Sequence, residues 1–286
     1  MNPDIQAFFD PDTFTITYLV SDPATRRAVI IDPVLDYDPK AARTSTQSAE
    51  AVLAAATAKN LTVEWILETH AHADHLSGAQ FLKARTGAKI AIGEHIKDVQ
   101  RVFRPIFDAM DVQGDGTPFD RLLGDGEALR VGGMIIEVMY TPGHTPACVS
   151  YKIGDDVFVG DTLFMPDYGT ARADFPGGNA HALYRSIRRI LSLPTGTTLW
   201  MCHDYKAPGR NTHAWRSSVA EQREKNVHVH DGINEDVFVT TRVARDRTLD
   251  MPVLILPSVQ VNIRAGQMPP PEADGHVYLK LPVNRL

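Results

Sequence analysis

The sequence predicts one compact α/β domain. Strand-like and helix-like segments alternate along most of the chain, no clean linker divides them, and 43% of the 286 residues are hydrophobic. This pattern is typical of a layered α/β fold with a sizeable core. We expect residues 1–250 to form the domain and residues 251–286 to form a short C-terminal extension that packs on it.

The first half of the chain alternates strands and helices. Strands are expected where β-branched and aromatic residues gather: 13–20, 27–32, 63–69 and 89–92. Helices are expected where alanine, leucine and long polar residues recur: 49–59, 76–85 and 95–110, the last broken at Pro105. The polar, glycine-rich residues 113–118 indicate an exposed loop.

The second half begins with short strands divided by glycine turns. These strands are expected at 128–131, 134–140, 148–153 and 156–160. Later elements are expected in this order: a helix at 181–193, a strand at 198–202, a helix at 212–225 and a helical piece after Asn234. From Met251 the tail carries six prolines, so we expect it to be largely irregular.

Composition excludes several classes of protein. The net charge of −6 argues against a nucleic-acid binder and against binding to an anionic membrane surface. No apolar run approaches the length of a membrane helix, and the acidic N-terminus does not resemble a signal peptide. Two cysteines imply no disulfide framework, so a reducing cytoplasmic location is the default expectation.

The histidines follow a metal-ligand pattern. His70, His72, Asp74 and His75 lie together just after a predicted strand. Three further motifs follow, each near the end of a β segment: Gly143-His144-Thr145, Gly160-Asp161-Thr162 and Cys202-His203-Asp204-Tyr205. Loops at one sheet edge are where α/β proteins place their chemistry, and imidazole with carboxylate suits borderline divalent cations. The sequence therefore predicts a metal site.

Other residues of chemical interest have simpler explanations. Six scattered histidines are expected to be solvated or core residues: His95, His181, His213, His228, His230 and His276. Cys202 stands beside His203 and invites comparison with a thiol nucleophile. Neighbouring strand residues point to opposite faces, however, so we expect Cys202 to pack inward, as we do Cys148.

The motifs THAHADH, PGHT, GDT and CHDY, in this order, resemble those of the metallo-β-lactamase superfamily over about residues 13–215. The resemblance implies an αββα sandwich, with two mixed sheets face to face, helices outside and metal at one sheet edge.

Within that superfamily, TPGHTPACVSY and GDTLF are similar to segments of glyoxalase II and of the glutathione-dependent persulfide dioxygenases. Three features favour the dioxygenases: GTARADF at 169–175, HDY at 203–205, and Pro257 with NIRAG at 262–266. The chain departs from the shorter dioxygenases by a longer stretch at 96–127 and by Tyr168, Thr170 and Ala171 in place of a glycine-cysteine-glycine run. It looks most like the longer bacterial type, which is often linked to rhodanese-type sulfurtransferases.

The resemblance implies one Fe(II) per chain, bound by His70, His144 and Asp161. His72, Asp74, His75 and His203 would then surround the iron and assist catalysis without binding it. The implied reaction oxidises glutathione persulfide with O₂ and water to sulfite and glutathione. The full ligand set for two metals is also present, so a dinuclear Zn²⁺ thioesterase of the glyoxalase II type stays open.

Glutathione carries two carboxylates, so basic and hydroxyl groups are expected near the site. The candidates are Arg172, Tyr205, Lys206, Arg210 and Arg264. We expect Asp174 to pair with a nearby arginine and the arginine-rich runs at 185–189 and 242–247 to be solvated surface. A rhodanese-type partner and a homodimer stay open, while intact ligand motifs disfavour a non-catalytic binding module.

Overall fold

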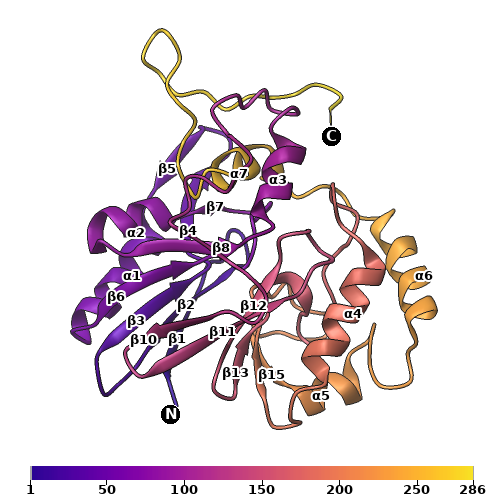
Figure 1. The fold of residues 1–286 in the computed structure, drawn as a ribbon. Helices are drawn as coiled ribbons and strands as arrows, with labels where there is room; N and C mark the ends of the chain where they lie inside the picture. Colours follow the sequence, from indigo (N-terminus) through magenta and orange to yellow (C-terminus); the bar gives the residue numbers. More distant parts are fainter. Residues whose placement is uncertain (1, 286) are drawn as a thin grey trace.

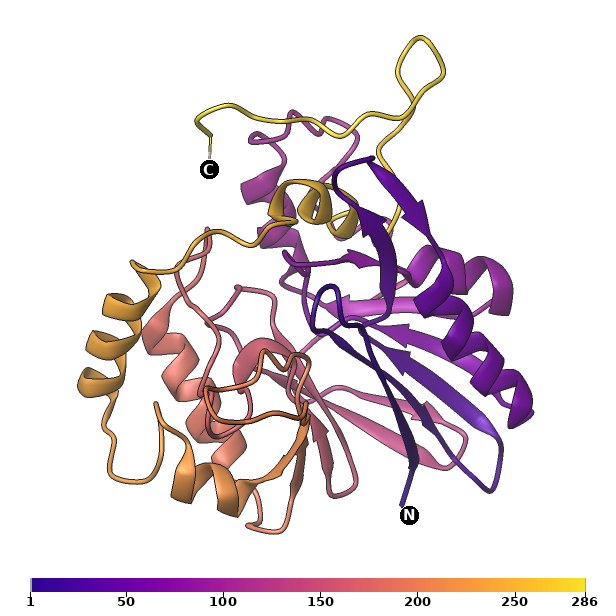
Figure 2. The ribbon, with the colours of Figure 1, turned by 180° about the vertical axis from the view of Figure 1, so that it is seen from behind.

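Two six-stranded sheets form the centre of the molecule. The computed structural model describes residues 2–285. The first sheet has the order β1-β2-β3-β6-β8-β9, the second has the order β10-β11-β12-β13-β14-β15, and a small third sheet has the order β5-β4-β7. Figures 1 and 2 show the two large sheets with helices on their outer sides. The expected αββα sandwich is confirmed.

The strands of the first and third sheets come from the first half of the chain. They are β1 (Asp4–Phe9), β2 (Ile16–Ser21), β3 (Arg27–Ile31), β4 (Val34–Asp38), β5 (Arg43–Ser45), β6 (Thr62–Leu67), β7 (Leu76–Ser77), β8 (Lys89–Gly93) and β9 (Arg121–Leu123). Those of the second sheet are β10 (Ala128–Val131), β11 (Met134–Tyr140), β12 (Val149–Ile153), β13 (Asp156–Phe158), β14 (Thr198–Trp200) and β15 (Arg216–Ser218).

The helices cover both outer faces. They are α1 (Gln47–Ala58), α2 (Ala79–Thr86), α3 (Ile96–Phe103), the short 3₁₀ turn η1 (Gly160–Thr162), α4 (Ala180–Leu191), α5 (Val219–Lys225), α6 (Glu235–Asp246) and α7 (Ile255–Asn262). None of the helices within residues 2–285 is long and apolar enough to cross a membrane.

Three apolar layers hold these elements together. Side chains such as Tyr18, Ile31 and Val138 fill the space between the two large sheets. A second layer packs α1, α2, α3 and α7 on the outer face of the first sheet, and a third packs α4, α5 and α6 on the second sheet. Each layer removes apolar surface from water, which stabilises the fold.

Four sequence-based expectations need correction. Strand β1 forms where no element was expected, and it pairs with β2 in antiparallel register. The expected helix at 76–85 begins as strand β7, because Leu76 and Ser77 pair with β4. The helix expected at 212–225 starts only at Val219, where the Ser218 side chain accepts a hydrogen bond from the amide of Glu221 and caps it. The tail is largely irregular, as expected, but it also contains helix α7, which was not expected.

The longer stretch at 96–127 lies against the C-terminal extension. It contains α3, β9 and the loop between them. The Gln100 side-chain amide donates to the carbonyl oxygen of Ile263 at 2.9 Å, just beyond the end of α7. Asp111 accepts two hydrogen bonds of 2.6 Å from the Arg264 guanidinium. The two segments therefore support each other.

Candidate metal centre

Seven side chains of the predicted motifs meet at one edge of the sandwich. His70, His72, Asp74 and His75 stand in the irregular loop between β6 and β7. His144 follows β11, Asp161 lies in η1 after β13, and His203 follows β14. Loops that leave neighbouring strands at the same end bring distant residues together. All but Asp74 are buried, and Asp74 is only partly exposed.

Within residues 2–285, four overlapping groups of side chains could hold a metal ion, and two of them include Cys202. The first cluster described below contains His70, His144 and Asp161, whose ligand atoms lie within 4.8 Å of one another. The Asp161 Oδ2 atom lies 3.9 Å from Nε2 of His70 and 3.7 Å from Nε2 of His144. Two imidazoles and one carboxylate thus face a common point.

Hydrogen bonds to the other ring nitrogens fix the tautomers of this cluster. The Thr69 hydroxyl donates to Asp32 Oδ2 at 2.8 Å, so it must accept from His70 Nδ1 at 3.0 Å. The His144 Nδ1 atom lies 2.9 Å from the carbonyl oxygen of Arg172, which can only accept. The Nε2 atoms of His70 and His144 therefore keep their lone pairs. Burial also lowers the pKa of both imidazoles, which favours the neutral form that metals bind.

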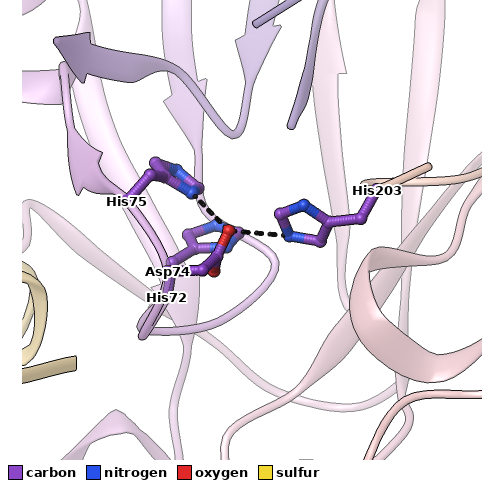
Figure 3. Close-up of side chains that lie close together, drawn as sticks. All are labelled: His72, Asp74, His75 and His203. Atoms are coloured by element: carbon purple, nitrogen blue, oxygen red, sulfur yellow. Dashed lines mark hydrogen bonds and ion pairs between the residues drawn. The ribbon is translucent and has the colours of Figure 1, made fainter. Parts of the chain in front are cut away.

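The second cluster contains His72, Asp74, His75 and His203. Figure 3 shows Asp74 between the rings of His75 and His203. The Asp74 Oδ2 atom lies 3.4 Å from His75 Nδ1 and 3.3 Å from His203 Nε2. His203 Nε2 also lies 3.4 Å from Asp161 Oδ1, so Asp161 stands between the two clusters.

His72 differs from the other histidines because two buried carboxylates face its ring. Its Nε2 atom lies 3.0 Å from Asp32 Oδ1 and 3.4 Å from Glu68 Oε2. Burial alone would lower the pKa of His72, but Asp32 and Glu68 outweigh it and raise this pKa well above its usual value. Neither carboxylate belongs to the sequence motifs, and both were missed by sequence analysis.

Several buried polar atoms at the site have no hydrogen-bond partner within residues 2–285. They include Nε2 of His70, His75 and His203, Nδ1 of His72, Oδ1 of Asp161 and Oε2 of Glu68. An unsatisfied buried polar group costs about 1–3 kcal/mol. A divalent cation would satisfy these atoms, and imidazole with carboxylate suits both iron and zinc. The site therefore fits a metal without specifying which one.

A cavity of about 680 Å³ opens onto both clusters through Asp74, His144 and Asp161. Its walls include the aromatic side chains of Phe14, Tyr37, Phe164, Tyr168, Phe175 and Tyr205, together with arginine and aspartate side chains. A metal-adjacent cavity with apolar walls and a few polar groups is typical of a small-molecule site.

Two of the five predicted substrate residues line this cavity, Arg172 and Tyr205. The Arg172 guanidinium donates to both Asp174 oxygens at 2.6 and 2.8 Å and to the carbonyl oxygen of Asp250 at 2.7 Å. The expected pairing of Asp174 with an arginine is confirmed. Most of the hydrogen-bonding capacity of Arg172 is therefore used within the protein.

The other three predicted substrate residues, Lys206, Arg210 and Arg264, are not among those that line the cavity. Arg210 contacts Asp204 and Asp167, and Arg264 is buried against Asp111. The structure therefore does not bring these residues to the cavity that opens onto the metal ligands.

Sequence analysis missed two arginines of α6 that line the cavity, Arg242 and Arg245. The expectation that residues 242–247 are all solvated is wrong for Arg242, which is buried and paired with Asp246 at 2.6 Å. The spacing of four residues between Arg242 and Asp246, on one helix face, was the available signal.

Neither cysteine has the environment of a nucleophile. Both are buried, as expected. Burial raises the pKa of Cys148 to about 12 and raises that of Cys202 well above its usual value. The thiolates that nucleophilic chemistry needs are therefore disfavoured.

The sequence model of the metallo-β-lactamase superfamily matches residues 11–203 of this chain. This range includes all seven clustered side chains. The chain belongs to the metallo-β-lactamase superfamily. Its fold is that of this superfamily, and the expected membership is confirmed.

Relatives within the superfamily carry different names. The chain is 53% identical to a protein of Burkholderia pseudomallei named as a metallo-hydrolase, over 99% of both chains. It is equally similar, at 53%, to a β-lactamase hydrolase-like protein of Xylella fastidiosa, but spans only 65% of that protein's length. It is 30% identical to the mouse mitochondrial persulfide dioxygenase ETHE1, over 93% of this chain and 90% of that one.

A solved structure supports the dioxygenase branch. The crystal structure of ETHE1 from Myxococcus xanthus superimposes with a TM-score of 0.74 at 31% identity, over 92% of this chain and all of that one.

Proposed function

We propose that this superfamily member is a non-haem Fe(II) persulfide dioxygenase. It would oxidise glutathione persulfide with O₂ and water to sulfite and glutathione. In this reaction the outer sulfur is oxidised, dioxygen is reduced, and the sulfur–sulfur bond breaks to release the thiol. Similarity to persulfide dioxygenases along nearly the whole chain supports this proposal.

The observation that carries the proposal is the composition of the first cluster. His70, His144 and Asp161 form a two-histidine, one-carboxylate set, which is typical of non-haem iron oxygenases and leaves coordination positions open for substrates. His72 belongs to the other cluster, and its Nε2 faces Asp32 and Glu68. When bound, Fe(II) would supply the redox chemistry that a persulfide and dioxygen require and that Zn²⁺ lacks.

The remaining residues would orient the ligands and shape the site. The Arg172 carbonyl and the Thr69 hydroxyl hold the rings of His144 and His70. His203 Nε2, between Asp74 and Asp161, is placed to hold a proton or a water next to the Asp161 carboxylate. Phe164 and Tyr205 lie beside His203, with ring centroids 6.3 and 5.6 Å away, and help to bury its ring.

A second candidate function is a dinuclear zinc thioesterase of the glyoxalase II type. The second cluster supports it, because His72, Asp74, His75 and His203 offer a complete donor set for another metal. The hydrolase names of relatives at 53% identity point the same way. A cytoplasmic location, a rhodanese-type partner and a homodimer stay predictions.

Two alanine substitutions separate these functions. His144→Ala should remove iron and persulfide-dependent oxygen uptake together, because it deletes one of three proposed ligands. His203→Ala should keep about one iron per chain while slowing oxygen uptake, because His203 would orient neighbours without binding iron. Metal content by plasma emission spectrometry and oxygen consumption with glutathione persulfide check both results. Two metals in the parent protein, one of which is lost in His203→Ala, would favour the thioesterase.

A further inference from the structure

Arg245 is a cation in the wall of the cavity without an acidic partner. Three arginines line this cavity, and Asp174 pairs with Arg172 while Asp246 pairs with Arg242. Within residues 2–285, the Arg245 guanidinium has no carboxylate within ion-pair distance and makes no hydrogen bond; it lies 5.9 Å from the centre of the Tyr168 ring. Its side chain is exposed toward solvent. A substrate anion that enters the cavity would therefore find this charge unneutralised.

A row of aromatic rings leads from the metal clusters to Arg245. His203 stacks on Tyr205 with ring centroids 5.6 Å apart, and Tyr205 lies 5.4 Å from Tyr168. Both tyrosines line the cavity. Within the part of the chain that the structure describes, neither tyrosine hydroxyl has a hydrogen-bond partner. Two free hydroxyl donors and a free guanidinium thus follow one wall of the same cavity.

The positive charges of Arg242 and Arg245 in the cavity wall also affect the neighbouring residue His228. His228 is close to α6, and burial together with the charges of Arg242 and Arg245 lowers its pKa to about 4. Arg242 is offset by Asp246, which leaves Arg245 as the cation available to a ligand.

We propose that Arg245 binds a carboxylate of the thiol substrate, assisted by the hydroxyls of Tyr168 and Tyr205. The substrate sulfur would lie at the metal ligands, and its carboxylate arm would extend along the tyrosines toward α6. Guanidinium and carboxylate form charge-assisted, fork-like hydrogen bonds, which explains an arginine here. We call Arg245 the carboxylate anchor. The candidates for this role from sequence were Arg172, Tyr205, Lys206, Arg210 and Arg264. The anchor rests on the proposed function only in naming glutathione persulfide as the ligand.

The test compares Arg245→Gln with Arg247→Gln. Arg247 caps the same helix, is exposed and is not among the cavity-lining residues, so both variants remove one positive charge from the same region. With glutathione persulfide, Arg245→Gln should raise KM about tenfold, equivalent to roughly 1.4 kcal/mol, and leave kcat nearly unchanged. With the persulfide of 2-mercaptoethanol, which has no carboxylate, KM should not change. Arg247→Gln should match the parent protein with both substrates.

Binding without turnover separates this inference from the proposed function. Titration calorimetry with S-methylglutathione should show binding to the parent protein and Arg247→Gln, and binding about tenfold weaker to Arg245→Gln. If binding depends on Arg245 but the iron-loaded parent does not oxidise the persulfide, the proposed function is wrong. The proposal that Arg245 binds a carboxylate would still be supported. Equal binding to all three proteins, or none to the parent, would overturn the anchor. Equal thermal unfolding midpoints would establish that the variants are folded.

Discussion

At the scale of single residues, the hydrogen bonds behind the proposed ligands orient them. Asp32 accepts from the amide of Thr69 at 2.7 Å and from its hydroxyl at 2.8 Å. The same carboxylate faces His72 Nε2 at 3.0 Å. Asp32 therefore sets the orientation of both His70, through Thr69, and His72. Partners of this kind fix the tautomer and basicity of metal-binding histidines.

Thr69→Val tests this orientation. Valine keeps the shape of threonine but removes the hydroxyl, so His70 Nδ1 loses its acceptor and the ring its fixed tautomer. We expect iron affinity to fall about 10- to 100-fold, measured by anaerobic competition with a chelator. Thr44→Val, at an exposed position on β5, is the matched control and should bind iron normally. Unchanged affinity in Thr69→Val would show that the Thr69 hydroxyl does not orient His70.

The seven clustered side chains were predictable from sequence because their motifs are short and stand at strand ends. Their partners were not. Asp32 and Glu68 carry no motif, and their role depends on β3 lying beside β6 in a parallel pair. The substrate residues were predicted less well, because whether an arginine is neutralised depends on carboxylates that the sequence does not place, such as Asp111 beside Arg264.

At the scale of elements, helix α7 is hydrogen-bonded to the loop between β6 and β7, which carries four of the seven clustered side chains and is called the metal loop below. The Asn262 side-chain amide donates to the carbonyl oxygens of His72 and His75, each at 2.8 Å. Its oxygen accepts from the amide of Ser77 at 2.8 Å. All three bonds are buried, so the last residue of α7 anchors both sides of the loop. The prolines of the tail obscured this helix, but Pro257 lies in its first turn, where the missing amide hydrogen costs nothing.

Asn262→Ala should therefore destabilise the protein and the metal site together. Loss of the side chain leaves two buried carbonyls and one buried amide without partners, at an expected cost of about 2–4 kcal/mol in unfolding free energy. Urea unfolding of the metal-free protein measures this cost. Gln267→Ala, at an exposed position after α7, should stay within about 0.5 kcal/mol of the parent. A similarly small effect in Asn262→Ala would contradict the role given to α7.

At the scale of the whole molecule, we propose that the C-terminal extension belongs to the catalytic domain rather than to a separate unit. The sandwich as such was predictable, because the motifs resemble those of a superfamily with this fold. The short strands β7, β9 and β15 were not, since each depends on pairing with a distant segment rather than on its own residues. The local hairpin of β4 and β5 was also not predicted. The same holds for the contact between residues 96–127 and the extension.

Two truncations test this proposal. A chain that ends at Gly266 keeps α7 and Asn262, so it should fold and bind iron like the parent. A chain that ends at Asp250 loses α7 from the apolar layer that it shares with α1 and α2. We expect this shorter chain to unfold at clearly lower urea concentration and to lose iron. Equal stability of the two truncated chains would show that the metal loop does not need α7.

We propose that His70, His144 and Asp161 would hold one iron, at which dioxygen would oxidise a persulfide. The most direct measurement is metal stoichiometry on protein prepared without oxygen, followed by oxygen uptake with glutathione persulfide on the same sample. We expect one iron per chain, with oxygen consumed as sulfite forms. Two zinc ions per chain, with glutathione thioester cleavage and no oxygen uptake, would contradict it.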